Sequence, residues 1–556
     1  MKKVIICLLV VMVALQFGCK KFLDVTPIDK LTGNNFFQSA NDVEVNLNDM
    51  YGRLFEKYAQ TNTAGGTGEM RSGEVIPSDN NQTVGYNHFN LGTGQFIDAA
   101  LVGGHTRVVH DSKGDLGPQT IGTTTVNDRL LQTAATNGGN YNGNGMRYNF
   151  YHLTQWSEYY DIIQGANILI SKLQGGIPAL TSDQTKGYIA EAKFIRCYCY
   201  FFMVRLFGDV VYYTAPYQKD PLPRTNMVTV VNNCIADLAP SKNDLPMIIS
   251  NPTFRAVRAS RGAIIGLLMN MYMWNAGFDA ANATKYYTNT AALGKEIRTS
   301  GAYQLVPLQQ WTTVTKGRSG ESLFEFFSTV NYNTSSPYFQ LAPFGESFIH
   351  FPYMLPEYNS RASFCVLTSQ YMKKLFPDQG QTDQRASIWF KDPFDQNAET
   401  FQLLKFAGNT NLSVSNDPAS QAIPDNTFLI MRYSDALLLE AEALYDLGDQ
   451  TGAATPLNIV RLRAGAELYP SKNDDAYLNM GDAIFYERAK ELIGEGSHYF
   501  DLVRTKRILN RSYTDNPLTR DKFDRGAWTW PIDPSVLNNH NPYMTLNQYW
   551  TSGQGL

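Results

Sequence analysis

The sequence contains few charged residues, and neither sign is in large excess. Asp, Glu, Lys and Arg make up 18% of its 556 residues, and the formal net charge is −4. Nucleic-acid-binding domains usually carry a clustered basic patch and a high isoelectric point. The charge balance of this chain therefore predicts no nucleic-acid partner.

Cysteine is rare, and the motifs of several enzyme classes are missing. After Cys19 the chain has only Cys197, Cys199, Cys234 and Cys365, too few for a disulfide framework at this length. We expect these four to be small residues of the core. The seven histidines form no His-Glu-x-x-His motif, and neither Gly-x-Ser-x-Gly nor a phosphate-binding loop occurs. The sequence thus predicts neither a cofactor nor a familiar catalytic motif.

Long apolar runs are also missing, apart from one near the N-terminus. Residues 4–15 carry no charge and follow Lys2 and Lys3, but they are too few to span a bilayer, which takes roughly 20 residues. This pattern is typical of a secretory signal. Because Cys19 directly follows Gly18, the segment resembles a bacterial lipoprotein signal. We expect 1–18 to be the signal, Cys19 to be lipidated and 19–34 to be a tether; an ordinary signal cleaved nearby is the alternative.

Helical stretches fall into two groups. Apolar residues that recur every three or four positions predict helices over 43–58, 148–173, 185–207 and 258–278, and again over 428–447, 455–463 and 482–509. Between and before them the segments 61–147 and 300–427 are irregular: the first is rich in Gly, Asn and Thr, and the second mixes short aromatic runs with Pro and Asn. Loops this long tend to be functional.

One helical pair has the spacing of tetratricopeptide-type hairpins. Ala441 and Ala453 are small residues on either side of Gly448, where a left-handed backbone would end the first helix. Gly277 and Ala283 repeat the pattern more loosely, and a general antiparallel hairpin is the alternative. The sequence therefore predicts a mainly α fold, in which tetratricopeptide-like helical hairpins form a scaffold, with long irregular loops and minor β structure. We expect one domain, 35–556, with scaffold segments of about 35–60, 148–300 and 428–510.

Three glutamates invite a catalytic interpretation. Glu487, Glu491 and Glu495 recur every four residues and would form one stripe on a helix. Paired carboxylates can hydrolyse glycosides. However, carboxylates on adjacent turns are only about 6 Å apart along the axis and point the same way. We expect instead a charge network that fixes this helix to the scaffold, with neutralising partners among the nearby cations Arg488, Lys490 and Arg504.

Several segments, in this order along the chain, together resemble the SusD/RagB family of outer-membrane nutrient-binding lipoproteins. They are KFLDVTP (21–27), YYDIIQGANILISKL (159–173), YIAEAKFIRCYCYFFMVRLFGDVVYY (188–213), FLIMRYSDALLLEAEALYDLG (428–448), IFYERAKELIGEGSHYFDLVRTKR (484–507) and WPIDPSVLNNHNP (530–542). The second contains the family's central Ala-Asn, and the third its Glu-Ala-x-Phe-x-Arg and Phe-Gly-Asp. The resemblance covers essentially the whole chain.

The resemblance implies a protein without catalytic activity on the surface of a Bacteroidetes-type outer membrane, held there by the lipid on Cys19. Such a protein binds an oligosaccharide and acts as a lid on a TonB-dependent transporter of the SusC type. The helical hairpins would contact the transporter, and the loops would hold the ligand. Two alternatives stay open: the same scaffold tuned to peptides or another nutrient, and a surface glycoside hydrolase.

Sugar recognition needs aromatic rings for the apolar faces of the sugar and polar side chains for its hydroxyls. In the family, an acidic residue and an aromatic residue of the first loop often contribute, and here they match Asp79 and Tyr86. The full set of candidates is Asp79, Tyr86, Asn87 and Phe89 in the first loop region and Trp311, Tyr332, Tyr338 and Trp389 in the second. For each ring, packing against the scaffold is the alternative.

Two further expectations concern the same loops and the remaining tryptophans. Replacing Tyr86 or Trp311 by Ala should weaken ligand binding and leave the melting temperature nearly unchanged. The acidic and Asn-rich loops leave a structural calcium open, although no metal ligands are predicted. The remaining tryptophans are expected to be structural, and these are Trp156, Trp274, Trp528 and Trp530.

Overall fold

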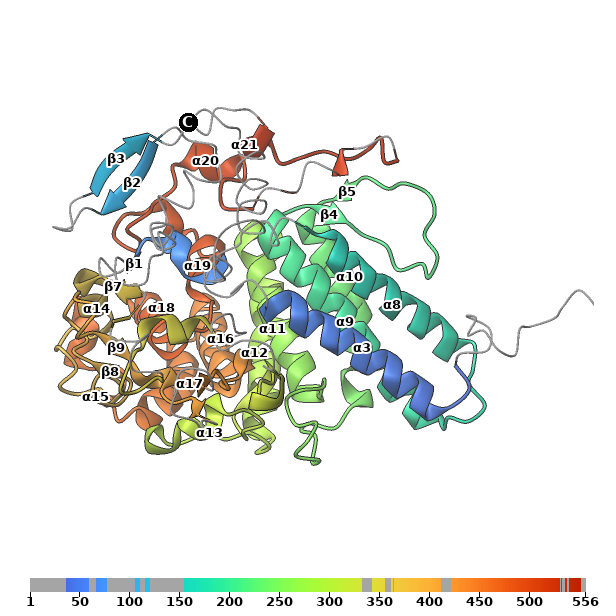
Figure 1. Cartoon of the computed structure of the whole chain (residues 1–556), viewed down its shortest axis with the longest axis horizontal. Helices are drawn as coiled ribbons and strands as arrows, with labels where there is room; N and C mark the ends of the chain where they lie inside the picture. The colour runs from blue at the N-terminus through green and yellow to red at the C-terminus, as the bar shows by residue number, and fades with distance from the viewer. Residues whose placement is uncertain are drawn as a thin grey trace, which may run out of the picture.

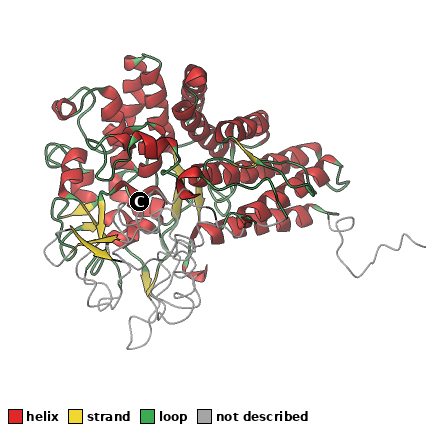
Figure 2. Ribbon diagram, turned by 90° about the horizontal axis from the view of Figure 1, so that it is seen from above, coloured by secondary structure: helices red, strands yellow, loops and turns green. Residues whose placement is uncertain are grey.

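Helices dominate the part of the chain that the computed structural model describes, which confirms the mainly α prediction (Figure 1). The described residues are 37–59, 67–77, 106–110, 116–120, 155–332, 343–355, 362–363, 365–411, 422–530, 532, 536–537 and 540–551. Figure 2 shows how helices fill most of this part, while the strands stay short.

The long helices come from the two stretches that the sequence assigns to the scaffold. The first group is α3 (Ala40–Ala59), α8 (Ser157–Gln174), α9 (Ser182–Phe207), α10 (Met227–Leu238), α11 (Arg261–Phe278) and α12 (Ala283–Thr299). The second group is α16 (Tyr433–Asp446), α17 (Gln450–Arg463), α18 (Met480–Glu491) and α19 (His498–Arg504). Shorter helices are α13 (Thr312–Thr315), α14 (Ser369–Leu375), α15 (Arg385–Ile388), α20 (Arg520–Asp524) and α21 (Gln548–Thr551).

The described strands form only two-stranded antiparallel pairs. These are β1 (Val75–Pro77) with β7 (Cys365–Leu367), β2 (Thr106–His110) with β3 (Leu116–Thr120), β4 (Val210–Val211) with β5 (Arg224–Thr225), β6 (Ser322–Phe326) with β12 (Phe428–Arg432), β8 (Phe390–Lys391) with β9 (Gln402–Leu403), and β10 (Thr410–Asn411) with β11 (Ala422–Ile423). The strands of the described residues therefore tie chain segments together in pairs, some of them far apart in sequence such as β1 and β7, and build no larger sheet.

The helices pack as a continuous array of neighbours. Helix α3 packs on α8, α8 on α9, α9 on α10, α10 on α11, α11 on α12, α12 on α16, and α16 on α17 and α18. The chain thus runs from one end of the molecule to the other as stacked hairpins (Figure 1). In the α16–α17 hairpin, Ala441 and Ala453 are both fully buried and Gly448 has a φ of 86°, as the spacing predicts.

Helix α9 is buried on nearly all sides from Ala190 onward, because α8, α10 and α3 pack against it. It begins with a capping box, in which the Thr181 hydroxyl accepts from the Gln184 backbone NH and the Gln184 side chain accepts from the Thr181 NH. Its buried residues include Cys197 and Cys199, and Cys234 of α10 and Cys365 of β7 are buried and unbridged as well. The expectation that these four cysteines belong to the core is confirmed.

Two helix predictions need correction. The stretch 428–447 begins as a strand, β12, which pairs with β6, because FLIMR satisfies a helical period and a strand period equally well. The stretch 482–509 is not one helix: α18 ends at Glu491, and the chain turns at Gly494, whose φ is 80°, before α19 begins.

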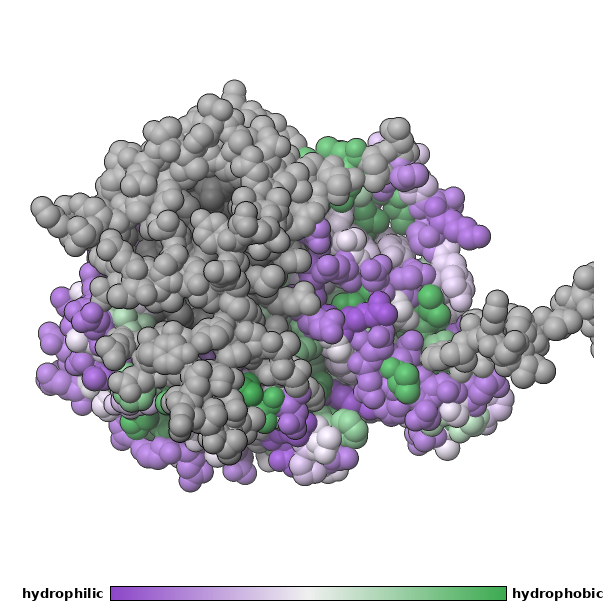
Figure 3. All heavy atoms as spheres, viewed as in Figure 1, coloured by the Kyte–Doolittle hydropathy of each residue, from purple (hydrophilic) through white to green (hydrophobic). Residues whose placement is uncertain are grey.

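The exposed helix faces are polar, and the tryptophans expected to be structural are buried. Trp156, Trp274, Trp528 and Trp530 all lie in the core. The coloured part of the surface in Figure 3 is mostly hydrophilic, with isolated hydrophobic residues. Within the described ranges, no helix is both long and apolar enough to cross a membrane.

Candidate functional site

Most of the predicted ligand-binding residues lie outside the part of the chain that the structure describes. Tyr332 is the last residue of the short 3-10 helix η9 (Val330–Tyr332), but its side chain is not described. The other candidates outside the described residues are Asp79, Tyr86, Asn87, Phe89 and Tyr338, as is Cys19. These assignments stay predictions.

Trp311 and Trp389 are described, and the structure places both in the core. Their side chains are only 4% and 1% exposed, and their ring centroids lie 4.7 Å apart. A ring that is covered on both faces cannot stack on a sugar, so the prediction is corrected for these two residues. They behave as the alternative proposed, by packing against the scaffold.

Three buried cations surround this tryptophan pair. The Lys405 ammonium lies 4.8 Å from the centroid of Trp389, and the guanidinium carbons of Arg432 and Arg463 lie 4.9 and 5.4 Å from the centroid of Trp311. Cations at this distance are attracted to the negative face of an aromatic ring. The two rings therefore form one wall of a buried charge network.

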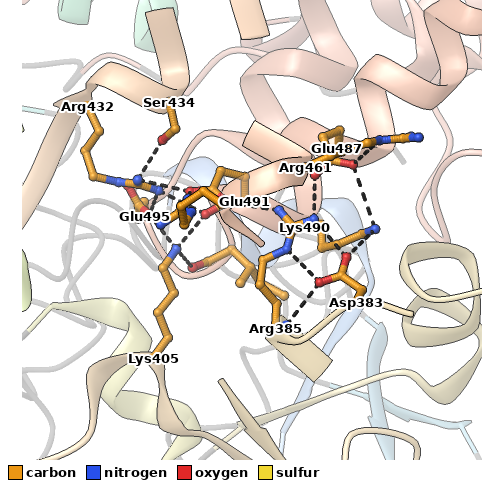
Figure 4. Close-up of polar contacts among 12 residues, drawn as sticks. Asp383, Arg385, Lys405, Arg432, Ser434, Arg461, Glu487, Lys490, Glu491 and Glu495 are labelled. Atoms are coloured by element: carbon orange, nitrogen blue, oxygen red, sulfur yellow. Dashed lines mark hydrogen bonds and ion pairs between the residues drawn. The ribbon is translucent and has the colours of Figure 1, made fainter. Parts of the chain in front are cut away.

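The network is built around Glu487, Glu491 and Glu495 (Figure 4). Glu491 accepts from Arg385 at 2.9 Å and Arg432 at 3.1 Å, and it also pairs with Arg463. Glu487 pairs with Arg385 at 2.5 Å and Arg461 at 3.1 Å. Glu495 pairs with Arg432 at 2.7 Å and with Lys405. Each of the three carboxylates therefore has at least two cationic partners.

These partners keep the glutamates ionised. Burial alone would raise the pKa of Glu491, but the charges of Arg463, Arg432 and Arg385 outweigh it and hold the pKa well below its usual range. The pKa of Glu495 is lowered as well, because Arg432 and Lys405 outweigh the effect of burial. A carboxyl that stays ionised and fully paired is unsuited to act as a general acid. The interpretation as a charge network is the one that the geometry supports.

Of the three expected neutralising partners, only Lys490 pairs with the glutamate stripe. Arg488 pairs with Asp435 and Asp501, and Arg504 pairs with Glu442 and Asp501. Lys490 binds Asp383 at 3.0 Å and reaches Glu487 only at 3.9 Å. Arg488 and Arg504 thus pair with carboxylates outside the stripe, Lys490 reaches only Glu487 of the stripe, and cations distant in sequence supply the other partners. Arg432 lies in the segment 428–448 that resembles the family, but sequence reasoning missed it as a partner of these glutamates.

The base of the first loop region is fixed to the closing segment of the chain. Arg71 is fully buried, and its two terminal nitrogens donate to the carbonyls of Ala527 at 2.7 Å and Trp528 at 2.8 Å. Its guanidinium carbon lies 4.8 Å from the centroid of Tyr499. Next to it, the backbone NH of Asn516 donates to the Ser72 carbonyl at 3.1 Å. The chain therefore enters 78–154 from a rigid point, and sequence reasoning missed Arg71.

The second loop region is fixed in the same way. Lys405 donates to the backbone carbonyls of Glu491 at 2.8 Å and Ile493 at 3.0 Å. Farther along, Asn426 donates from Nδ2 to Glu346 and to the Phe406 carbonyl, both at 2.9 Å. Within the described ranges, no group of three His, Cys, Asp or Glu side chains could hold a metal ion. The described part of the site is thus a rigid frame at the feet of the two loop regions.

Two family models match the chain. One, described as "SusD family", matches residues 390–550, and the other, described as "Starch-binding associating with outer membrane", matches residues 97–273. Among curated proteins, the SusD-like protein P38 of Formosa agariphila is 25% identical over 70% of this chain and 79% of its own length.

Solved structures show the same fold. The crystal structure of a SusD homologue from Bacteroides thetaiotaomicron is 30% identical, with a TM-score of 0.72, and covers 92% of this chain and 98% of its own. Surface glycan-binding protein A from Bacteroides thetaiotaomicron, solved in complex with laminarihexaose, is 18% identical with a TM-score of 0.58 and covers 92% of this chain and 100% of its own. The chain therefore belongs to the SusD family, whose members are non-catalytic binding proteins.

Proposed function

We propose that the protein is a cell-surface lipoprotein that binds an oligosaccharide and passes it to a TonB-dependent transporter of the SusC type. The observation that carries the proposal is the match, over nearly the whole chain, to the SusD homologue. The family description "Starch-binding associating with outer membrane" supports a glycan and an outer-membrane location. The proposal includes the division into a signal (1–18), a lipidated tether from Cys19 (19–34) and one folded unit (35–556).

The ligand site is proposed to lie in the two loop regions above the rigid frame. Trp311 and Trp389 are no longer candidates, so the aromatic rings proposed for the site are those of Tyr86, Phe89, Tyr332 and Tyr338. Asp79 and Asn87 supply the polar contacts. The fixed bases support this assignment, because a binding constellation needs backing that locks its orientation.

Calorimetry with a ligand panel tests the site. The panel contains maltoheptaose, laminarihexaose and a mixture of short peptides, and Tyr86→Ala is compared with Tyr543→Ala, a control on an exposed tyrosine. We expect one of the glycans to bind, Tyr86→Ala to weaken binding at least about tenfold, which is about 1.4 kcal/mol, and the control to bind normally. Peptide binding alone would favour the alternative in which the same scaffold is tuned to peptides, and release of cleavage products would favour a hydrolase.

A second experiment tests the anchor and the partner. Cys19→Ser should abolish labelling with radioactive palmitate and move the protein out of the membrane fraction, because stable anchoring needs acyl chains on that residue. A transporter of the SusC type should co-purify with the wild-type protein from outer membranes. Membrane association that survives Cys19→Ser would contradict the lipoprotein assignment.

A further inference from the structure

A polar cleft lies on the first group of helices, among α8, α9, α10 and the segment that follows β4. Its volume is about 500 Å³, within the range of about 300–1,000 Å³ that is usual for small-molecule sites. In Figure 1 these elements lie on the side of the molecule opposite α14, α15 and α18. The cleft is lined by Ile170, Gln174, Lys193, Arg196, Tyr212, Thr214, Asn233, Ala236 and Asp237.

The floor of this cleft is a fixed hydrogen-bond network. Arg196 is buried and donates to Asn167 Oδ1 at 2.6 Å and to Asp237 Oδ2 at 2.5 Å. Lys193 lies 3.2 Å from the other Asp237 oxygen and donates to the Asp237 carbonyl at 3.1 Å and the Ser241 hydroxyl at 3.3 Å. Asn167 belongs to the Ala-Asn motif and Arg196 to the Glu-Ala-x-Phe-x-Arg motif. Neither motif has a role in the proposed loop site.

The two cations of the floor are engaged with Asp237 and its neighbours. The Lys193 ammonium has three protons and three nearby acceptors, and both terminal nitrogens of Arg196 are engaged. Asp237, whose side chain is 21% exposed, still has spare lone pairs, because a carboxylate can accept about four hydrogen bonds. The floor therefore offers acceptor capacity at Asp237.

The walls supply uncommitted polar groups and an aromatic ring. In the described part of the chain, the side chains of Gln174, Thr214 and Asn233 make no hydrogen bond, and all three are at least partly exposed. Tyr212 packs against Tyr200 with a centroid distance of 4.8 Å, and it also lines the cleft. Amides, hydroxyls and one carboxylate beside an aromatic ring match the alternating hydroxyls and apolar face of a sugar.

We infer that this cleft is a second, auxiliary site for a neutral, hydroxyl-rich ligand of about one hexose unit. The fixed Asp237 carboxylate accepts from ligand hydroxyls, the Gln174 and Asn233 amides bridge neighbouring hydroxyls, and Tyr212 covers the apolar face. The two cations of the floor are held by Asp237 and its neighbours, so the uncommitted groups of the walls are neutral amides and a hydroxyl, which favours a neutral ligand. The inference does not depend on the loop site or on the transporter.

A local methyl signal tests the inference directly. The purified chain, in a detergent without a sugar headgroup, carries ¹³C-methyl alanine, and Ala236→Ser assigns the Ala236 signal in the cleft. Titration with D-glucose should shift this signal and saturate in the range of about 1–10 mM, which suits a small, open site. The Ala292 methyl on the exposed side of α12 should not move. An Ala236 signal that stays still up to saturating glucose overturns the inference.

Two comparisons sharpen the result. Gln174→Ala should weaken the glucose affinity measured from the Ala236 shift about two- to tenfold, as expected for one lost hydrogen bond. Gln450→Ala, at an exposed position at the start of α17, should leave the affinity unchanged. D-glucuronate should bind no more tightly than glucose. An unchanged affinity in Gln174→Ala, or clearly tighter binding of glucuronate, would show that the cleft does not recognise sugars in this way.

Discussion

Replacing Arg432 by Met removes the cation that joins three acidic side chains inside the buried network. The Arg432 side chain is fully covered and pairs with Glu321, with Glu491 at 3.1 Å and with Glu495 at 2.7 Å. Breaking a buried ion pair by removing one partner typically costs about 3–5 kcal/mol, because a charge stays buried without compensation. We expect Arg432→Met to lower the free energy of unfolding by about this amount.

The magnitude depends on which acid is left alone. Glu491 keeps Arg385 and Arg463, and Glu495 keeps Lys405. Among the cations of the described residues, Glu321 keeps Arg463 alone, at 3.8 Å, together with a hydrogen bond from the Val306 NH at 2.7 Å. Adding Glu321→Gln to Arg432→Met should therefore recover more stability than adding Glu495→Gln, by about 1 kcal/mol. The double variants show whether the lost stability comes from stranded charge.

Urea unfolding followed by circular dichroism measures these differences, with Arg520→Met as the control. Arg520 forms an i,i+4 pair with Asp524 in which the two side chains are 73% and 53% exposed, so its loss should change stability by less than about 1 kcal/mol. The same experiment at several pH values tests whether the stability difference shrinks or grows in acid.

In the wild type the pKa of Glu495 is lowered, because Arg432 and Lys405 outweigh burial, so its ionisation stabilises the fold above the usual glutamate pKa of 4.5. That contribution is lost as the pH falls through the lowered pKa. Without Arg432, the ionisation of Glu495 contributes less stability than in the wild type. The difference in unfolding free energy between the wild type and Arg432→Met should therefore be largest near neutral pH and shrink in acid. A deficit as small as that of Arg520→Met, or one that grows in acid, would refute the reasoning.

Three further predictions use the same unfolding measurement. Gly277→Ala should destabilise the protein, because an added Cβ would lie 2.1 Å from the Arg504 carbonyl oxygen. Gly52→Ala should stabilise the protein by about 0.5–1 kcal/mol, because Gly52 has open space around it in α3. Equal effects of the two substitutions would contradict this. Trp311→Ala should cost about 3–5 kcal/mol, contrary to the unchanged melting temperature that the sequence suggested, and a stable variant would restore the loop interpretation. Burial, only partly offset by a hydrogen bond from the Arg318 NH, raises the pKa of Glu325 to about 7. The free energy of unfolding of the wild type should therefore fall by up to about 3 kcal/mol as the pH rises from 4.5 to above 7, and that of Glu325→Gln should not. Parallel pH profiles of the two proteins would exclude this.

The sequence predicts the helical scaffold well because periodicity and small-residue spacing are local signals. The α16–α17 hairpin follows from Ala441, Gly448 and Ala453 alone. The break between α18 and α19 was also readable, since Gly494 and Gly496 lie at the turn and both have positive φ. It was missed because the apolar period continues across the break. The strand β12 was missed because five residues are too few to separate the two periods.

The burial of Trp311 and Trp389 could not be read from their surroundings. Both lie in stretches with loop composition, and what covers them comes from far along the chain, including Arg432 and Lys405. The same holds for the partners of the glutamate stripe. Contacts between residues distant in sequence depend on the tertiary arrangement, and they leave no local pattern in the sequence. Whether a loop aromatic faces solvent or the core is therefore the weakest part of a prediction from sequence.

The position of the buried network suggests what it contributes. It joins the segment 383–405 of the second loop region to α18 and the turn after it (Figure 4). Replacing such a network with apolar residues often leaves stability unchanged or improved, so its value to this protein does not follow from stability alone. Ion pairs with guanidinium groups are directional, and Arg385, Arg432 and Arg461 each hold two or more acceptors in fixed geometry. In a fold whose binding surface is proposed to rest on long irregular segments, the orientation of the feet of those segments sets the positions of the ligand-binding side chains. An apolar replacement of the whole network should therefore keep the fold and lose ligand affinity, because the hydrophobic core that the second loop region shares holds the fold together but lacks the directional contacts of the guanidinium pairs.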